Sequence, residues 1–408
     1  MHLSDPFQSG GQGTTGDRRR PCRLGASHVT ASDSRFLYFF LFLPQGMIVP
    51  FLTPWMVAKG IPMAIAGGLL AFSYLSKAIV NPYVGRLSDR IDPLVLLRVM
   101  ALGTALLYLA LPLAGWQVAI VIIAAVYLVQ PGMYPICERV AADIVLRTGA
   151  SYGRMRLWGS TGFAVGGVVF GWAAGSTGLE SLNSWIAGCF LAACLLCLFI
   201  GRPVTAKRAV GGLSDFRSLK GHAGPVFAGS LCQASNAFLY SFGGLYLLTH
   251  GWQTHEVALL WSLGIAFEIA ALSAPLDRLR LGPQQMLALS ATFTAVRWTI
   301  FAFSTSFAVL AVAQVLQAFT IGVNNTAFMS YVNSRAVDER IRGSLIGTYG
   351  ALANGLLMGS LVLVSSLLYP LIAQYCFAVM ALAALVAGAI ALVSIPPAMG
   401  SRPVRYGG

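Results

Sequence analysis

The sequence predicts an all-helical integral membrane protein with twelve transmembrane helices, arranged as two six-helix repeats. Of its 408 residues, 57% are hydrophobic and only 10% are charged, and the mean hydropathy is +0.72. Soluble domains carry about 25% charged residues. Twelve apolar runs are also long enough to cross the ~30 Å hydrocarbon layer as helices, and the basic residues gather in alternate connections between them. This composition excludes a soluble enzyme, a disordered chain and a fibrous protein.

The chain opens with a polar segment. Residues 1–35 are rich in Gly, Ser and Arg, and they lack the apolar core of about 7–15 residues that a signal peptide requires. We therefore expect a disordered cytoplasmic tail.

The apolar runs then follow in order, with one long polar interruption. The first six are predicted at 36–57, 64–84, 94–113, 117–137, 154–175 and 183–201, and the fourth can continue past Glu138. Residues 202–222 form the interruption, which we interpret as a cytoplasmic linker. The second six are predicted at 223–249, 257–275, 285–304, 307–331, 344–369 and 371–395, followed by a cytoplasmic tail, 396–408.

The basic residues fix the predicted orientation, because Lys and Arg are retained on the cytoplasmic side. Of the 27 basic residues, 24 fall in the tails, the linker and the connections after even-numbered runs, while Lys59 lies on the opposite side. Both termini are therefore expected in the cytoplasm. The net charge of +13 is a signature of topology, so we expect no nucleic-acid partner.

The two halves resemble each other in sequence. "LSDRIDP" follows the second run and "LDRLRLGP" follows the eighth, so that Asp89 and Asp277 are 188 residues apart. Parallel six-helix repeats are one architecture of membrane transporters. We therefore expect a bundle at 36–201 and another at 223–395. The 44 glycines suit close packing of membrane helices.

Motifs for metals and cofactors are lacking in the sequence. Cys194 and Cys197 form a CxxC within an apolar run, but there is no second pair and no nearby His, and cysteines in such runs act as small hydrophobic residues. There is also no Walker A or HExxH motif. We expect no cofactor, no metal and no enzymatic activity.

Charged residues within the runs are the best candidates for a functional site, because a charge at mid-membrane costs a few kcal/mol unless it faces a cavity or a partner. Lys77, Glu268 and Arg297 lie well inside predicted spans, and Glu138 and Arg156 lie near the inner ends of the fourth and fifth. Glu268 and Arg297 are on consecutive spans, where their side chains either meet directly or hold a substrate between them. The alternative interpretation is a structural ion pair, and Lys77 can also serve as an anchor at the membrane surface.

The segment "NPYVGRLSDRIDP" resembles the major facilitator superfamily, in which the loop after the second helix reads G-x-L-x-D-R. Gly85, Leu87, Asp89 and Arg90 match this pattern. The resemblance implies the major facilitator fold, with Gly85 giving close packing and with Asp89 and Arg90 making gating contacts.

Other strings are similar to the branch that contains lactose permease and the 3-phenylpropionate permease. "YGRMRLWGSTGF" (152–163) resembles the start of the fifth helix in both, while "LLWSLGIAFEIA" (259–270) and "AVRWTIFAF" (295–303) resemble the phenylpropionate permease most. The tenth helix departs from lactose permease, because Gln317 and Thr320 stand in place of its His and Glu.

This resemblance implies residue roles. Arg156 matches the sugar-binding arginine of lactose permease, Glu138 matches its acidic partner, and Phe163 stands where a Trp stacks on the sugar. Glu268 and Arg297 match residues that act in binding and proton coupling. We expect a substrate site formed by Lys77, Glu138, Arg156, Phe163 and Arg297, with Glu268 as the proton-coupling acid, because the tenth helix lacks one.

The predicted function is that of a secondary transporter in a bacterial inner membrane. It moves a small organic solute by alternating access with a proton, and we expect a monomer in the lipid bilayer. The candidate charged residues within the spans carry more positive than negative charge, which favours a monocarboxylate as substrate. The aromatic side chains of Phe163, Tyr74 and Trp158 favour an aromatic acid. Sugars and nucleosides are the alternative substrates. A sensor without transport activity, and a channel, are the alternative classes of protein.

Overall fold

The computed structural model describes residues 30–200, 220–273, 281–334 and 337–395. Within these ranges all the regular structure is helical, as predicted. The first half contains α1 (Ala31–Ala58), α2 (Met63–Ser88), α3 (Pro93–Ala110), α4 (Trp116–Val129), α5 (Met133–Thr148), α6 (Tyr152–Thr177) and α7 (Leu182–Phe199). The second half contains α9 (Ala223–Ala234), α10 (Gly244–Thr249), α11 (Thr254–Ser273), α12 (Pro283–Phe303), α13 (Phe307–Gln314), α14 (Asn324–Val332), α15 (Arg342–Ala351), α16 (Leu357–Ile372) and α17 (Cys376–Ser394).

Each predicted span corresponds to a helical segment. Ten helical stretches of the described chain are long and apolar enough to cross a membrane. The last of them, Glu339–Ser394, turns at Ala373, where φ is +45°, and so holds the two final spans. The seventh span, 223–249, is helical but interrupted, and it is not among the ten. The fourth span continues through α5 to Thr148, as expected.

Two boundaries carry clear local signals. Helix α1 begins at Ala31, inside the predicted tail, because Thr30 and Asp33 cap each other: the Thr30 hydroxyl accepts from the Asp33 amide at 3.2 Å, and the Asp33 carboxylate accepts from the Thr30 amide at 2.8 Å. The expectation that 31–35 is disordered is therefore wrong. Helix α5 ends at Thr148, and the Gly149 that follows has a φ of +68°, which suits glycine. The remaining tail, most of the linker, the C-terminal tail and the Asp277 repeat lie outside the described residues.

Three helices of the second half contain a π-helical turn. These turns are Leu239–Gly243 between α9 and α10, Ala318–Val323 between α13 and α14, and Leu352–Leu356 between α15 and α16. In the first half, the 3-10 turn Gln130–Gly132, which contains Pro131, interrupts the fourth span between α4 and α5. Such irregular turns often mark functional sites in helices.

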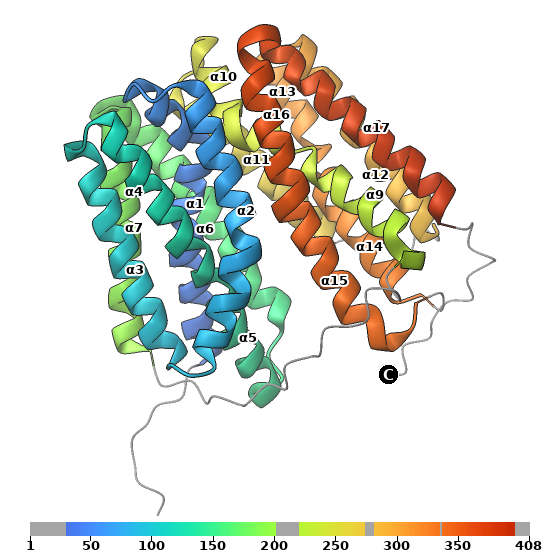
Figure 1. The fold of residues 1–408 in the computed structure, drawn as a ribbon, viewed down its shortest axis with the longest axis horizontal. Coiled ribbons are helices and arrows are strands. Elements are labelled where there is room, and N and C mark those ends of the chain that lie inside the picture. Colours follow the sequence, from blue (N-terminus) through green and yellow to red (C-terminus); the bar gives the residue numbers. More distant parts are fainter. Residues whose placement is uncertain (1–29, 201–219, 274–280, 335–336, 396–408) are drawn as a thin grey trace, which may run out of the picture.

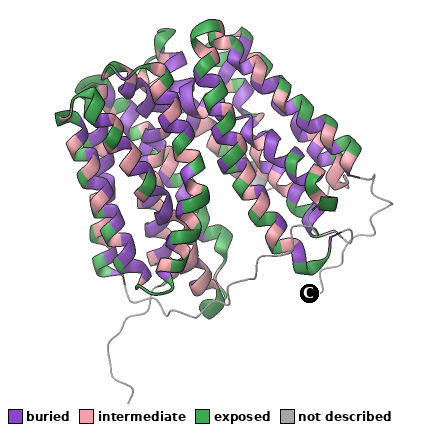
Figure 2. Cartoon of the chain, viewed as in Figure 1, coloured by how far each residue is buried: buried purple, intermediate pink, exposed green. Residues whose placement is uncertain are grey.

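The helices form two bundles, α1 to α7 and α9 to α17, that lie side by side (Figure 1). We call the end that holds the connections 88–93 and 148–152 the arginine-rich end, because Arg86, Arg90, Arg147 and Arg154 lie in or beside them. The end that holds 58–63 and 249–254 is the arginine-poor end. The bundles converge at the arginine-poor end and diverge at the other. Exposed residues recur along the outer helices of both bundles (Figure 2). Many exposed residues are large and apolar, for example Leu113 and Val393, each 90% exposed. A surface of this kind suits lipid.

Contacts between the bundles lie in the halves of the helices nearest the arginine-poor end. The Thr254 hydroxyl of α11 donates to the Gly171 carbonyl of α6 at 2.7 Å. A side chain at Gly67 of α2 would collide with Ser366 of α16. His255 stacks on Trp172 with ring centroids 4.7 Å apart. In this conformation the protein is therefore closed at the arginine-poor end.

Candidate functional site

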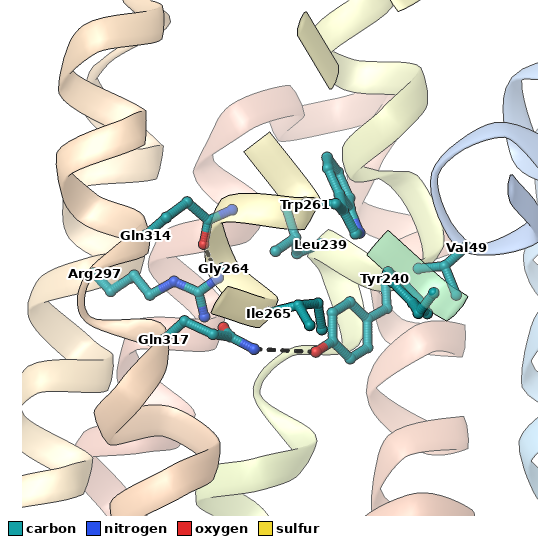
Figure 3. Close-up of a pocket in the computed structure, with 10 residues that line it drawn as sticks. Val49, Leu239, Tyr240, Trp261, Gly264, Ile265, Arg297, Gln314 and Gln317 are labelled. Carbon is teal, nitrogen blue, oxygen red and sulfur yellow. Dashed lines mark hydrogen bonds between the residues drawn. The ribbon is translucent and has the colours of Figure 1, made fainter. Parts of the chain in front are cut away.

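Two adjacent pockets lie between the bundles. The first, which we call the Arg297 pocket, is surrounded by helices of both bundles (Figure 3). Its lining consists of Val49, Phe163, Leu239, Tyr240, Trp261, Gly264, Ile265, Arg297, Gln314 and Gln317. Aromatic and aliphatic side chains form most of the wall, and the polar groups come from α12, the α13–α14 segment and Tyr240 between α9 and α10. Such a combination is typical of small-molecule sites.

Arg297 is a buried cation held by neutral groups. Its side chain is 1% exposed. Nη2 donates to Gln314 Oε1 at 2.7 Å, and Nη1 donates to Asn236 Oδ1 at 3.3 Å and to Thr320 Oγ1 at 3.5 Å. Its guanidinium carbon lies 4.3 Å from the centre of the Trp298 ring. Nε has no hydrogen-bond acceptor among the described residues. No carboxylate of the described residues forms an ion pair with this guanidinium.

Tyr240 and Gln317 join two of the π-helical segments at the pocket. Gln317 Nε2 donates to the Tyr240 hydroxyl at 3.3 Å (Figure 3). Tyr240 lies within the turn Leu239–Gly243, and Gln317 directly precedes the turn Ala318–Val323. The irregular turns thus position two polar side chains of the pocket.

The second pocket, which we call the Lys77 pocket, belongs mainly to the first bundle. It is lined by Gln45, Ile48, Val49, Leu70, Ser73, Tyr74, Lys77, Tyr127, Gln130, Pro131, Tyr134 and Tyr240. Val49 and Tyr240 line both pockets. The two pockets are therefore neighbours that meet at these side chains.

Lys77 lies in its pocket with an aromatic partner. Its Nζ is 4.3 Å from the centre of the Tyr74 ring, which is a cation–π contact. Lys77 makes no ion pair with another described residue. Lys77 and Tyr74, two of the candidates from the sequence, therefore lie side by side in this pocket.

Glu138 and Arg156 form an ion pair, although they lie outside both pockets. Arg156 Nη1 donates to Glu138 Oε1, and the hydroxyls of Tyr38 and Tyr152 donate to Glu138 Oε2, the Tyr38 contact measuring 2.9 Å. The Arg156 side chain is 54% exposed and that of Glu138 is 33% exposed. The pair therefore lies toward the arginine-rich end, where the bundles diverge.

Glu268 does not pair with Arg297 in this conformation. Neither residue takes part in an ion pair within the described chain, and the hydrogen bonds of Arg297 all go to neutral side chains. Glu268 is half-buried on α11, within electrostatic range of both Arg156 and Arg297. Of the two expected arrangements, direct pairing is therefore absent here.

Of the three residues in the predicted gating loop, Gly85, Asp89 and Arg90, Asp89 makes an ion pair. Arg139 Nη1 donates to Asp89 Oδ1 at 2.6 Å and to Ser88 Oγ at 2.8 Å, which ties α5 to the end of α2. Arg90 is exposed. A Cβ at Gly85 would have no atom of the described residues within 4 Å. The close packing expected at Gly85 is therefore absent in this conformation.

Phe163 lines the Arg297 pocket, whereas Trp158 contacts Phe36 and Phe39 outside both pockets. The sequence analysis missed Tyr127, Tyr134, Gln314 and Trp261. The signal for Tyr127 and Tyr134 was their position on either side of Pro131, where the helix is interrupted.

The protein has two bundles of membrane-spanning helices with a pair of pockets between them. This architecture is typical of membrane transporters. Residues 34–379 match the MFS_1 like family. The chain belongs to this family of the major facilitator superfamily, and it is a transporter rather than an enzyme.

Similar proteins include two curated bacterial transporters. The chain is 29% identical to the "Probable 3-phenylpropionic acid transporter" of Escherichia coli (strain K12), over 90% of this chain and 95% of that protein. It is 27% identical to the "Maltose permease" of Geobacillus stearothermophilus, over 78% and 82%. The crystal structure of nucleoside transporter NupG superposes with a TM-score of 0.74 at 15% identity, covering 89% of this chain and 98% of that one. This last likeness shows the fold alone.

Proposed function

We propose that the protein is a proton symporter for a small organic monocarboxylate, with an aromatic acid as the best candidate substrate. The observation that carries the proposal is the charge of the central pockets. Lys77 and Arg297 line them, and neither described lining contains an acidic residue. An anion balances such buried positive charge better than a neutral solute does.

The apolar lining supports an aromatic substrate. Phe163 and Trp261 contribute aromatic surface to the Arg297 pocket, and Val49 and Leu239 contribute aliphatic surface. Flat apolar ligands pack well on such walls. The relative named as a probable 3-phenylpropionic acid transporter agrees with this substrate class.

Alternating access is the proposed mode of transport. The bundles meet near the arginine-poor end, through pairs such as Thr254 with Gly171, and the Glu138–Arg156 pair near the other end is partly exposed. Rocking of the two bundles about the central pockets would expose the site to each side in turn. By the distribution of arginines, we assign the arginine-rich end, both termini and the 202–222 linker to the cytoplasm of a bacterial inner-membrane protein. We also propose that it acts as a monomer.

Glu268 is the proposed proton carrier. It is an acid on a membrane-spanning helix that makes no ion pair within the described residues, near the charges of Arg156 and Arg297. Movement of the bundles, or arrival of an anionic substrate at the cationic groups, would change the field at Glu268. Such a change can couple protonation to substrate binding.

A sugar or nucleoside is the second candidate substrate, and the amides of the pockets favour it. Gln45, Gln130, Gln314 and Gln317 line the two pockets, and amides pair readily with hydroxyl groups. The relative named as a maltose permease fits this alternative.

A thermal-shift screen of the purified protein tests the proposal. Aromatic acids, their neutral amides, sugars and nucleosides are compared at equal concentration, because a ligand that binds the folded state raises the melting temperature. The proposal predicts stabilisation by aromatic acids and weaker stabilisation by their amides. Stabilisation by sugars or nucleosides alone would contradict it. Binding without any flux in liposomes would favour a sensor.

A further inference from the structure

The Lys77 pocket contains a cation whose charge is not balanced locally. The described lining holds no Asp or Glu. Among the described residues, the Lys77 ammonium makes a cation–π contact with the Tyr74 ring and no ion pair. An ammonium has three donors, and the described residues give Lys77 no hydrogen-bond acceptor. Arg297 differs, since three side chains already accept from its Nη atoms.

Two buried hydroxyls line the same pocket. The hydroxyl oxygens of Tyr127 and Tyr134 are inaccessible to solvent and have no hydrogen-bond partner among the described residues. A buried donor without an acceptor is unfavourable, and an ionised acceptor satisfies it best. Opening of the pocket around these hydroxyls would add two neutral donors to the Lys77 ammonium, which together form a set suited to a carboxylate.

The neighbouring Arg297 pocket offers a different environment. Phe163, Trp261 and Leu239 form an apolar wall there, and Val49 and Tyr240 belong to both linings. A ligand with an anionic group at one end and a ring at the other would match the two environments in turn.

We propose that Lys77, together with the hydroxyls of Tyr127 and Tyr134, holds the carboxylate of the substrate, while its ring lies in the Arg297 pocket. This inference rests on the proposed function and deepens it, because it assigns the charge recognition to the first bundle and the ring recognition mainly to the second. Arg297 then contributes positive potential and rigidity, and it does not contact the carboxylate.

The test measures the affinity of the purified full-length protein for 3-phenylpropionate and for its neutral isostere, 3-phenylpropionamide. Lys77→Gln should weaken binding of the acid about tenfold or more, which is the usual cost of losing a hydrogen bond to a charged group, and should leave the affinity for the amide within about twofold. Lys77→Arg, which keeps the charge, should restore part of the lost affinity. Tyr127→Phe and Tyr134→Phe should each weaken the acid more than the amide.

Matched controls come from the same chain. Lys59→Gln removes a lysine at the arginine-poor end, where its Nζ donates to the Pro112 carbonyl at 2.8 Å. Tyr83→Phe removes a hydroxyl from a side chain that is 64% exposed. Both controls should bind the acid like the wild type. Retained binding of the amide shows that a variant is folded.

Two failures are distinguishable. If the wild type binds 3-phenylpropionate and Lys77→Gln binds it equally well, the carboxylate site is elsewhere and this inference is wrong. If the wild type binds no aromatic acid but binds a sugar or nucleoside, the proposed function fails, and the inference fails with it.

Discussion

Arg156 of α6 and Glu138 of α5 form an ion pair across the connection at the arginine-rich end, and two tyrosine hydroxyls donate to the same carboxylate. The pair joins two helices that the sequence places next to each other. Because both side chains are partly exposed, its strength is expected in the range of surface pairs, below about 1 kcal/mol.

A double-mutant cycle tests this estimate. Glu138→Gln, Arg156→Gln and the double variant are compared by unfolding in detergent. The expected coupling free energy is about 0.5–1 kcal/mol. Asp143→Asn is the control on the same helix, where Asp143 pairs with Arg147 one turn away. Zero coupling between Glu138 and Arg156 would mean that the pair contributes nothing in solution.

Arg297 should be sensitive even to a substitution that keeps its charge. Its guanidinium reaches three acceptors on two separate spans, and an ammonium at this position cannot reach all of them. Arg297→Lys is therefore expected to lower the free energy of unfolding by about 1–3 kcal/mol, which is the usual cost of leaving buried polar groups without hydrogen-bond partners. Thermal unfolding in detergent measures the change, with the exposed Arg340→Lys as control. Equal stability of Arg297→Lys and the wild type would show that these hydrogen bonds are dispensable.

Adjacent glycines of α2 provide a matched test of the closed end. A Cβ at Gly67 would collide with Ser366 of the other bundle, whereas a Cβ at Gly68 would have no atom of the described residues within 4 Å. Gly67→Val should therefore separate the bundles at the arginine-poor end, and Gly68→Val should not. The measurement is the reactivity of a Val49→Cys variant, at a position that lines both pockets, with an impermeant maleimide applied from that end. Reactivity should rise with Gly67→Val only, and equal reactivity in the two backgrounds would refute the role of this contact.

Glu268 should be required for coupling but not for binding. Glu268→Gln removes the proposed proton site and keeps the size of the side chain. In proteoliposomes this variant should lose accumulation driven by a pH gradient and retain counterflow exchange. Glu256→Gln is the control, since Glu256 lies in the first turn of the same helix and accepts from the Gln253 amide at 2.8 Å. If Glu268→Gln concentrates substrate at the wild-type rate, another group carries the proton.

The fold was largely predictable, because hydropathy and arginine distribution act within each segment. The spans, the continuation of the fourth one to Thr148 and the neighbouring positions of Glu138 and Arg156 all follow from local sequence. The start of α1 was missed by a few residues because Thr30 and Asp33 form a capping box in a polar stretch.

The details of the site were less predictable, because they depend on contacts between distant segments. The acceptors of Arg297 are Asn236, Gln314 and Thr320, and nothing in their local sequence identifies them as its partners. The π-helical turns that contain Tyr240 and Thr320 each include a glycine, Gly243 and Gly322, but glycines are common throughout the spans and do not distinguish these turns.

The most direct test of the central claim is uptake of labelled 3-phenylpropionate by the wild-type protein in proteoliposomes, with an inward proton gradient and protein-free liposomes as control. The account predicts saturable uptake that exceeds equilibrium, is abolished when the gradient is collapsed, and is inhibited by other aromatic acids more than by their amides. Uptake no greater than that of protein-free liposomes, from protein that still binds a sugar or nucleoside, would contradict it.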